Sequence, residues 1–294
     1  MLTLDLAARV TAGLAMPDGS GAQTNPAGVV LLSCEDDLAD TVLPRLRVAG
    51  ADVSRIISRS EVYEGWDGRR PPTIGDIEHL ADDIQDCGGK LVVVDPLAAF
   101  LGEDTHPYRD GEVRRALQPL ADLAAHFNAA VVLVRHLRKQ ADGNPINAGG
   151  GSIGVMAAAR VAFLCTNDRT DATGNRRVLA QIKTNVGQRA ASLAFPLVEE
   201  EGIPRMAWEG RSELTAEMLL SRPAGEARGR PRDAAIEFLR EELGDGPRPA
   251  VEVLEQAARM EISERTLRRA AGELGVRIER KGFGPGSCVV WSLP

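Results

Sequence analysis

Two carboxylates follow two short apolar runs in the first third of the chain. Glu35 comes shortly after Val29–Ser33, and Asp95 comes directly after Leu91–Val94. Apolar runs of four or five residues are typical of strands that are covered on both faces of a parallel sheet. The carboxyl ends of such strands meet at one edge, where ligands bind. Carboxylates at that edge can bind a divalent cation or accept a proton from a bound water.

Further polar residues follow the next predicted strands. His136 comes two residues after Ala130–Val134, and Lys183 closes the run Val178–Lys183. The segment 138–151 between them is polar and glycine-rich, as surface loops are. An isolated histidine is more often structural than chemical, the lysine could be an exposed strand residue, and the loop could be an inert connection. These patterns alone therefore leave the three roles open.

The elements that must position these residues alternate along residues 1–210. Apolar strands are separated by amphipathic stretches such as 112–127, in which apolar residues recur every three or four positions. This alternation predicts an α/β fold with a mostly parallel sheet and flanking helices. After Cys165 the runs are separated by glycine, proline and polar turns, which predicts antiparallel strands. The strands predicted for the parallel sheet are Val29–Ser33, Leu91–Val94, Ala130–Val134 and Val161–Cys165, and those predicted to be antiparallel are Val178–Lys183, Ser192–Pro196 and Arg205–Trp208.

A second, smaller domain is expected at the C-terminus. Residues 211–230 are rich in arginine, glycine and proline, and we expect them to form a linker. Residues 231–294 then show three helical patterns, of which the third follows the N-cap residue Ser263 and stops at Gly275. Two short strands around a glycine-rich turn come last. Three helices and a hairpin predict a small winged helix-turn-helix domain.

The third helix of that domain carries arginines on the face opposite its apolar stripe. These are Arg265, Arg268 and Arg269, while Arg280 and Lys281 lie in the hairpin. Such a distribution suits a recognition helix in the major groove of duplex DNA and a wing that reaches phosphates. Residues 226–294 contain 12 acidic and 12 basic residues, so a protein-docking role stays open.

The composition excludes several classes of protein. The net charge of −7 argues against coating nucleic acid by bulk attraction, so any DNA contact must use local basic patches. The four cysteines form no C-x-x-C pair, which disfavours a zinc cage or a disulfide framework. No run of 18 apolar residues and no signal-peptide pattern is present. We expect a cytoplasmic protein that neither enters nor crosses a membrane.

Residues 1–205 resemble the RepA-like AAA ATPases, the branch of RecA-type P-loop NTPases that includes hexameric replicative helicases. In such proteins a G-x-x-x-x-G-K-[ST] loop immediately precedes a helix like the one predicted from Leu2 to Leu14. No such loop is found in this sequence. The markers that carry the resemblance, in chain order, are Val29–Asp37, Leu91–Pro96, Val132–Lys139, Gly149–Arg160 and Ile182–Asn185.

The resemblance implies ATP and Mg²⁺ as ligands and assigns roles to four residues. Glu35 matches the glutamate that orients or deprotonates the attacking water, and Asp95 matches the Walker B aspartate that reaches Mg²⁺. His136 matches a sensor of the γ-phosphate region. Lys183 matches a cation that reaches the nucleotide of a neighbouring subunit. The missing loop would supply most of the contacts to the phosphates, so we expect ATP hydrolysis by this sequence to be poor or absent.

The resemblance also implies contact with DNA. In RecA-type rings the loop that corresponds to residues 138–151 faces the central channel, which makes Arg138 and Lys139 candidates for contact with single-stranded DNA. The winged helix would then contact duplex DNA. A homo-oligomeric ring is the expected assembly.

Three hypotheses follow for the function. The first is an ATP-driven helicase or a related replication or mobile-element ATPase, which requires the phosphate loop. The second is a non-enzymatic DNA-binding protein, in which a degenerate ATPase core is a scaffold for the winged helix. The third is a truncated relic of a mobile element. Within the same fold, a recombination or KaiC-like signalling ATPase is less favoured because of the appended winged helix.

Overall fold

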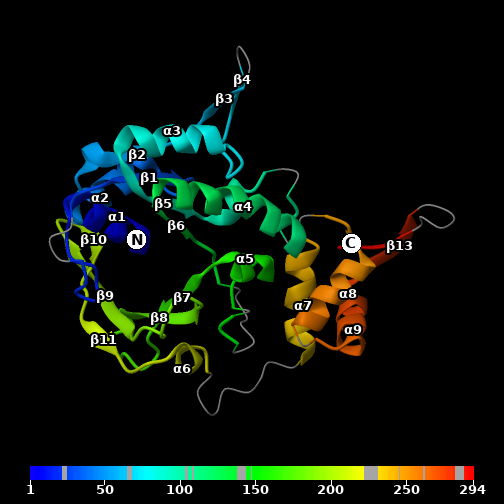
Figure 1. Ribbon diagram of the computed structural model, residues 1–294. Coiled ribbons are helices and arrows are strands. Elements are labelled where there is room, and N and C mark those ends of the chain that lie inside the picture. Colours follow the sequence, from blue (N-terminus) through cyan, green and yellow to red (C-terminus); the bar gives the residue numbers. More distant parts are fainter. Residues whose placement is uncertain are drawn as a thin grey trace. The chain divides into compact units, whose positions relative to one another are not determined.

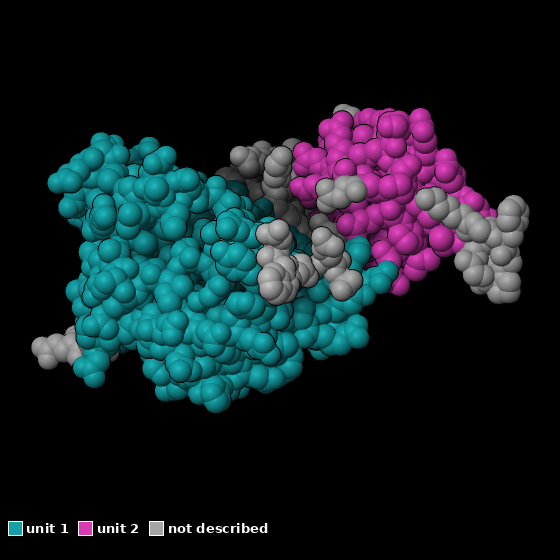
Figure 2. Space-filling view, turned by 90° about the horizontal axis from the view of Figure 1, so that it is seen from above, with its two compact units in different colours: residues 1–221 teal, residues 222–294 magenta. Residues whose placement is uncertain are grey.

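The computed structural model forms two compact units, residues 1–221 and 222–294 (Figure 2). We describe each unit by itself. The residues that the structure describes are 1–21, 25–64, 68–102, 105–107, 109–137, 144–146, 148–221, 231–244, 246–260, 262–281 and 288–294.

A four-stranded parallel sheet forms the centre of the first unit. Its strand order is β2 (Ile56–Ser58), β1 (Gly28–Ser33), β5 (Gly89–Asp95) and β6 (Ala130–Leu133). Every neighbouring pair is parallel. The apolar residues of β1 and β5 are buried on both faces, which confirms the predicted parallel sheet.

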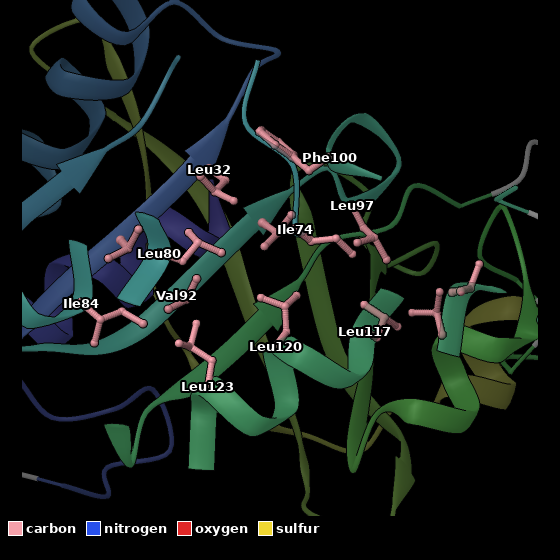
Figure 3. Packing of buried hydrophobic residues seen from close by; sticks show 14 residues of the cluster. Leu32, Ile74, Leu80, Ile84, Val92, Leu97, Phe100, Leu117, Leu120 and Leu123 are labelled. Carbon is pink, nitrogen blue, oxygen red and sulfur yellow. The ribbon is translucent and has the colours of Figure 1, made fainter. Parts of the chain in front are cut away.

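Helices cover both faces of this sheet. Alternate residues of each strand point to opposite faces, so each strand places apolar side chains on both faces. Val30 and Leu32 of β1 pack in one cluster with α3 (Ile77–Cys87) and α4 (Asp110–Phe127). Figure 3 shows this cluster, and Figure 1 shows the two helices over the sheet. On the other face, Val29 and Leu31 pack against α1 (Leu2–Ala12) and α2 (Leu43–Val48). The remaining elements before α5 are η1 (Leu38–Val42), η2 (Val53–Arg55), β3 (Val62–Glu64), β4 (Gly68–Arg70) and η3 (Leu97–Phe100).

A second, antiparallel sheet completes the first unit, as predicted for the residues after Cys165. The prediction that Val161–Cys165 belongs to the parallel sheet was wrong, because β7 (Val161–Asn167) pairs antiparallel with β8 (Arg176–Thr184). Strands β10, β9, β8 and β7 are neighbours in that order, and β11 also pairs with β9. Leu164, Val178 and Ala194 fill its core together with Ala216 and Leu219 of α6. The elements are α5 (Ile153–Ala158), β7 (Val161–Asn167), β8 (Arg176–Thr184), β9 (Ser192–Glu200), β10 (Ile203–Met206), β11 (Gly210–Ser212) and α6 (Ala216–Leu220).

The sequence prediction places the start of the linker, 211–230, too early in the chain. Residues 210–212 form β11, and α6 buries Ala216 and Leu219 in the core of the second sheet. Residues 211–221 therefore belong to the first unit, because their apolar side chains have a surface to cover. The rest of the expected linker lies outside the described residues.

The second unit consists of three helices and a small antiparallel sheet. Helices α7 and α9 pack around a core that contains Leu239, Val253, Leu267 and Trp291. The three helices predicted for this region are present, and a short strand between α7 and α8 was not predicted. The sheet order is β12-β14-β13. The elements are α7 (Pro231–Glu242), β12 (Arg248–Pro249), α8 (Ala250–Arg259), α9 (Glu264–Leu274), β13 (Arg277–Lys281) and β14 (Cys288–Ser292).

Among the described residues, no helix combines the length and the apolar character that crossing a membrane requires.

Candidate functional site

Glu35 and Asp95 lie at the same edge of the parallel sheet. Ser33 at the end of β1 is the register partner of Asp95 at the end of β5, and Glu35 follows Ser33 by two positions. Desolvation raises the pKa of the Cys34 thiol, and the nearby negative charges of Glu35 and Asp95 raise it further. Both carboxylates thus lie close enough to the Cys34 thiol to raise its pKa. The sequence prediction that they share one edge agrees with this geometry.

His136 contacts Glu35 directly. Its Nε2 atom lies 2.9 Å from Oε1 of Glu35, and the side chains are 65% and 53% exposed. His136 follows β6, whereas Glu35 follows β1, and β5 lies between these strands in the sheet. The contact therefore crosses the end of β5, the strand that ends in Asp95. Of the four site residues proposed for nucleotide chemistry, the structure brings Glu35, Asp95 and His136 to one edge.

The other two acids of the Glu35-Asp36-Asp37 run have local partners. Asp36 pairs with Arg45 at 2.7 Å. Asp37 caps the next helical turn, where its Oδ1 accepts hydrogen bonds from two backbone N–H groups. Glu35 is the acid of this run that reaches a side chain from another strand end.

Thr3 joins the site from the first turn of α1. Its hydroxyl donates a hydrogen bond to Oδ2 of Asp95 at 3.1 Å, and the residue is buried. Sequence reasoning missed Thr3. The available signal was a hydroxyl residue in the first turn of the helix that the family resemblance places beside the nucleotide.

Helix α1 is held in place by further contacts, which Asp5 makes. Asp5 accepts a hydrogen bond from Nε1 of Trp208 at 2.9 Å and one from Arg9 at 2.8 Å. The indole ring packs against Phe195 of β9, with ring centroids 4.8 Å apart. Because Asp5 is buried, these bonds satisfy a carboxylate that would otherwise be costly to bury. They fix the helix that carries Thr3.

Lys183 lies apart from these contacts. Its ammonium group donates to the backbone carbonyls of Met156 at 2.6 Å and Ala159 at 2.7 Å, at the C-terminal end of α5. A cation suits this position, because the unpaired carbonyls of a helix end carry partial negative charge. Its expected reach to a neighbouring subunit's nucleotide stays a prediction.

The loop residues Arg138 and Lys139 lie outside the described part of the chain. The structure describes the two ends of their segment, where Leu137 and Gly149 form an antiparallel bridge. The contact of these two cations with single-stranded DNA stays a prediction.

The arginines of the second unit differ in their local partners. Ser263 caps α9 through a hydrogen bond from the N–H of Thr266. Arg268 is paired with Glu264 on the same helix at 2.7 Å. Arg265 and Arg269 are exposed, one turn apart, and neither forms an ion pair within the described part of the chain. The side chain of Lys281 lies outside that part.

The donor set at the sheet edge suits a hard cation. Within the described ranges, no three His, Cys, Asp or Glu side chains cluster as a complete metal site. Mg²⁺ binds through oxygen ligands, and in nucleotide sites it takes one or two carboxylates and fills its other positions with phosphates and waters. The carboxylate of Asp95 and the hydroxyl of Thr3 fit that requirement.

Comparison with known proteins finds a family match for part of the chain. Residues 1–142 match the family model described as an AAA domain, and this range includes Thr3, Glu35, Asp95 and His136. The match supports a P-loop NTPase family for these residues. No curated protein matches the chain.

One similar solved structure is a KaiC-like protein from the hyperthermophilic archaeon Pyrococcus horikoshii OT3. Its sequence is 13% identical, the similarity covers 62% of this chain and 77% of that chain, and the TM-score is 0.40.

Proposed function

We propose that the first unit is an ATPase domain that acts on DNA and that the second unit binds duplex DNA. The observation that carries the ATPase part is the pair of contacts at one sheet edge, Glu35 with His136 and Asp95 with Thr3. Both pairs fall in the segment that matches the AAA domain model. A carboxylate for a cation and a second carboxylate for water are the residue types that phosphoryl transfer to water requires.

Asp95 and Thr3 are the residues that would hold Mg²⁺ together with ATP. A bound Mg²⁺ would neutralise the developing charge on the phosphates. The protein's own contribution is to hold the oxygen of Asp95 at the end of β5. The hydrogen bond from Thr3 and the burial of that hydroxyl fix the carboxylate before any ligand arrives.

Glu35 would orient the attacking water and accept its proton. One carboxylate oxygen, Oε1, is held by Nε2 of His136. Because Oε1 is held, the orientation of the carboxylate is fixed. The other oxygen, Oε2, is the atom that would hold the water. His136 acts as the group that fixes the direction of this base and senses what binds beside it.

Three observations support DNA binding by the second unit. Helices α8 and α9 follow each other with a short turn, as in a helix-turn-helix, and β13 and β14 form a hairpin that suits a wing. The cap of α9 is formed by Ser263. Arg265 and Arg269 leave two cationic side chains exposed one turn apart on α9. We propose that these two arginines contact the phosphates or base edges of duplex DNA.

The finer assignment is a replicative-helicase-like or mobile-element replication protein. A homo-oligomeric ring, single-stranded DNA on Arg138 and Lys139, and the reach of Lys183 to a neighbouring subunit belong to this assignment. Each follows from the family resemblance and is part of the proposal.

The test is ATP hydrolysis by the full-length natural protein, with and without DNA. Glu35→Gln should lower the rate by about 10²–10⁴-fold, because the amide cannot accept the proton, and should leave nucleotide binding in place. Asp36→Asn is the matched control, since it removes a neighbouring carboxylate whose partner is Arg45. Absence of hydrolysis with and without DNA would overturn the ATPase assignment, and equal measurable rates in the wild type and Glu35→Gln would overturn the role of Glu35 as the base. Duplex binding with no nucleotide binding would leave a non-enzymatic DNA-binding protein.

A further inference from the structure

Arg135 donates three hydrogen bonds to backbone carbonyls beside the candidate site. It lies just after β6 and immediately before His136. Its Nε donates to the carbonyl oxygen of Gly150 at 2.9 Å, and its Nη2 donates to that of Gly149 at 3.1 Å. A further bond joins Nη2 to the Gly150 oxygen. One planar guanidinium thus holds two consecutive backbone carbonyls.

The backbone of His136 is held by the same short segment. The N–H of Gly150 donates to the carbonyl oxygen of His136 at 2.9 Å, and Leu137 bridges Gly149. Arg135 and His136 therefore bind the same residue pair, Gly149 and Gly150. Arg135 does so through its side chain, and His136 through its main chain.

Glycine at position 149 leaves room for the guanidinium to lie on this segment. A Cβ atom on Gly149 would lie 3.1 Å from Cζ of Arg135, closer than ordinary van der Waals contact. The absence of a side chain allows the flat guanidinium to lie against the backbone. A Cβ atom at position 149 would require the guanidinium to shift by a few tenths of an ångström.

The segment that Arg135 holds is itself anchored on the other side. The N–H of Ser152 donates to the carbonyl oxygen of Pro107 at 2.9 Å, and the Ser152 hydroxyl bonds the Asp110 carboxylate at the start of α4. Gly151 between them adopts φ of 79°, the left-handed conformation that glycine allows without strain. Helix α4 packs on the core of the sheet. The glycine pair is thus a fixed support for Arg135.

We propose that Arg135 is a positioning residue for the Glu35–His136 pair. By holding Gly149 and Gly150, its guanidinium fixes the backbone of His136 and hence the direction from which Nε2 meets Glu35. This inference rests on the proposed function only in naming Glu35 as the base. Arginine suits the role better than lysine, because a rigid planar fork of donors can hold two carbonyls, whereas an ammonium is a point charge on a flexible stem.

The test compares Arg135→Ala and Arg135→Lys with the wild type by NMR of histidine-labelled protein. The chain has four histidines, and the His136 signals are identified by their loss in His136→Asn. In the wild type, Glu35→Gln should shift the His136 imidazole signals because it changes the atom bonded to Nε2. In the Arg135→Ala background that response should fall at least twofold, and Arg135→Lys should resemble Arg135→Ala.

Arg115→Ala is the matched control, because the exposed guanidinium of Arg115 bonds a carbonyl within α4, away from His136. It should leave the response of His136 to Glu35→Gln unchanged. If Arg135→Ala fails to fold, Gly149→Ala displaces the guanidinium while keeping the arginine and should weaken the same response. A full response in every folded variant would overturn the positioning role.

ATP hydrolysis separates the failure of this inference from the failure of the proposed function. If the ATPase assignment holds, Arg135→Ala should lower kcat about tenfold and leave KM within twofold, since the residue acts on the base and not on nucleotide binding. If hydrolysis is absent in the wild type, the NMR response still decides the positioning role.

Discussion

Nε2 of His136 lies 2.9 Å from Oε1 of Glu35, although 101 positions separate the two residues in the chain. The contact is possible because both residues follow strands of one parallel sheet and lie beyond its carboxyl edge. The strand between them ends in Asp95, whose carboxylate accepts a hydrogen bond from Thr3. Chain topology thus brings together the three residues that we propose as a base, a group that orients it and a ligand for a cation.

The Thr3 hydroxyl is expected to matter for metal-dependent activity. Thr3→Val should raise the Mg²⁺ concentration needed for half-maximal ATP hydrolysis about tenfold, because Asp95 loses its donor and the cation loses an oxygen ligand. Thr3→Ser keeps the hydroxyl and should stay within about twofold of the wild type. Identical Mg²⁺ dependence in the valine and serine variants would exclude Thr3 from the site.

Cys34 provides a chemical probe of the sheet edge. Its pKa is raised, first by desolvation and then by Glu35 and Asp95, so its exposed thiol should react slowly with iodoacetamide at pH 8. Asp95→Asn removes one negative charge, which lowers the thiol pKa and should speed alkylation. Asp122→Asn, an exposed acid on α4, should not. Peptide mass spectrometry measures the rate at Cys34, and equal rates in all three proteins would place Asp95 away from this edge.

The two exposed arginines of α9 should govern the salt dependence of DNA binding. Each phosphate contact contributes about 0.9 to the slope of log K against log salt, so the double variant Arg265→Ala with Arg269→Ala should flatten the slope by up to about 1.8. Arg232→Ala is the matched control, because its guanidinium pairs with Glu273. A duplex titration at several salt concentrations gives the slope. An unchanged slope in the double variant would favour protein docking as the role of this unit.

The stability of the first unit should depend on the ionisation of Asp76. Hydrogen bonds from Arg70, then from Thr73, hold the pKa of Asp76 well below its unfolded value of 3.8. A lowered folded-state pKa means that this stabilisation is present above pH 3.8 and declines as the pH falls below that value. Asp76→Asn should therefore lower the free energy of unfolding at pH 7.

The difference between Asp76→Asn and the wild type should shrink below pH 3.8. Urea unfolding at pH 7 and at pH 3 measures this difference in the free energy of unfolding, with Asp122→Asn as a surface control. A difference that is constant from pH 7 to pH 3 would contradict the proposed role of the charge.

The sequence predicted the elements that are long or strongly apolar. Strands β1, β5 and β6 were predicted because valine and leucine run through them, and Glu35, Asp95 and His136 were chosen as candidates because each follows such a run. The strands β2, β3, β4, β11 and β12 were missed. Each has only two or three residues and lacks a clear apolar pattern, so its existence depends on a partner strand rather than on local sequence.

The remaining differences depend on contacts between distant segments. Thr3 was missed because a hydroxyl in a first turn gives no signal until Asp95 is placed beside it. The bonds of the Lys183 ammonium to the end of α5 could not be read from the sequence, and its role at a neighbouring subunit's nucleotide stays a prediction. Arg135 carried no motif, because its partners are two backbone carbonyls.

The most direct test of the central claim is to replace Mg²⁺ by paramagnetic Mn²⁺ and add ATP to the histidine-labelled full-length protein. His136 should lose its NMR signals, because the claim places the metal-nucleotide complex at the carboxyl edge of the sheet. His126 near the end of α4 precedes β6 and so belongs to the opposite edge, and its signals should remain sharp. Sharp His136 signals at saturating Mn²⁺ and ATP, or equal broadening of both histidines, would contradict the account.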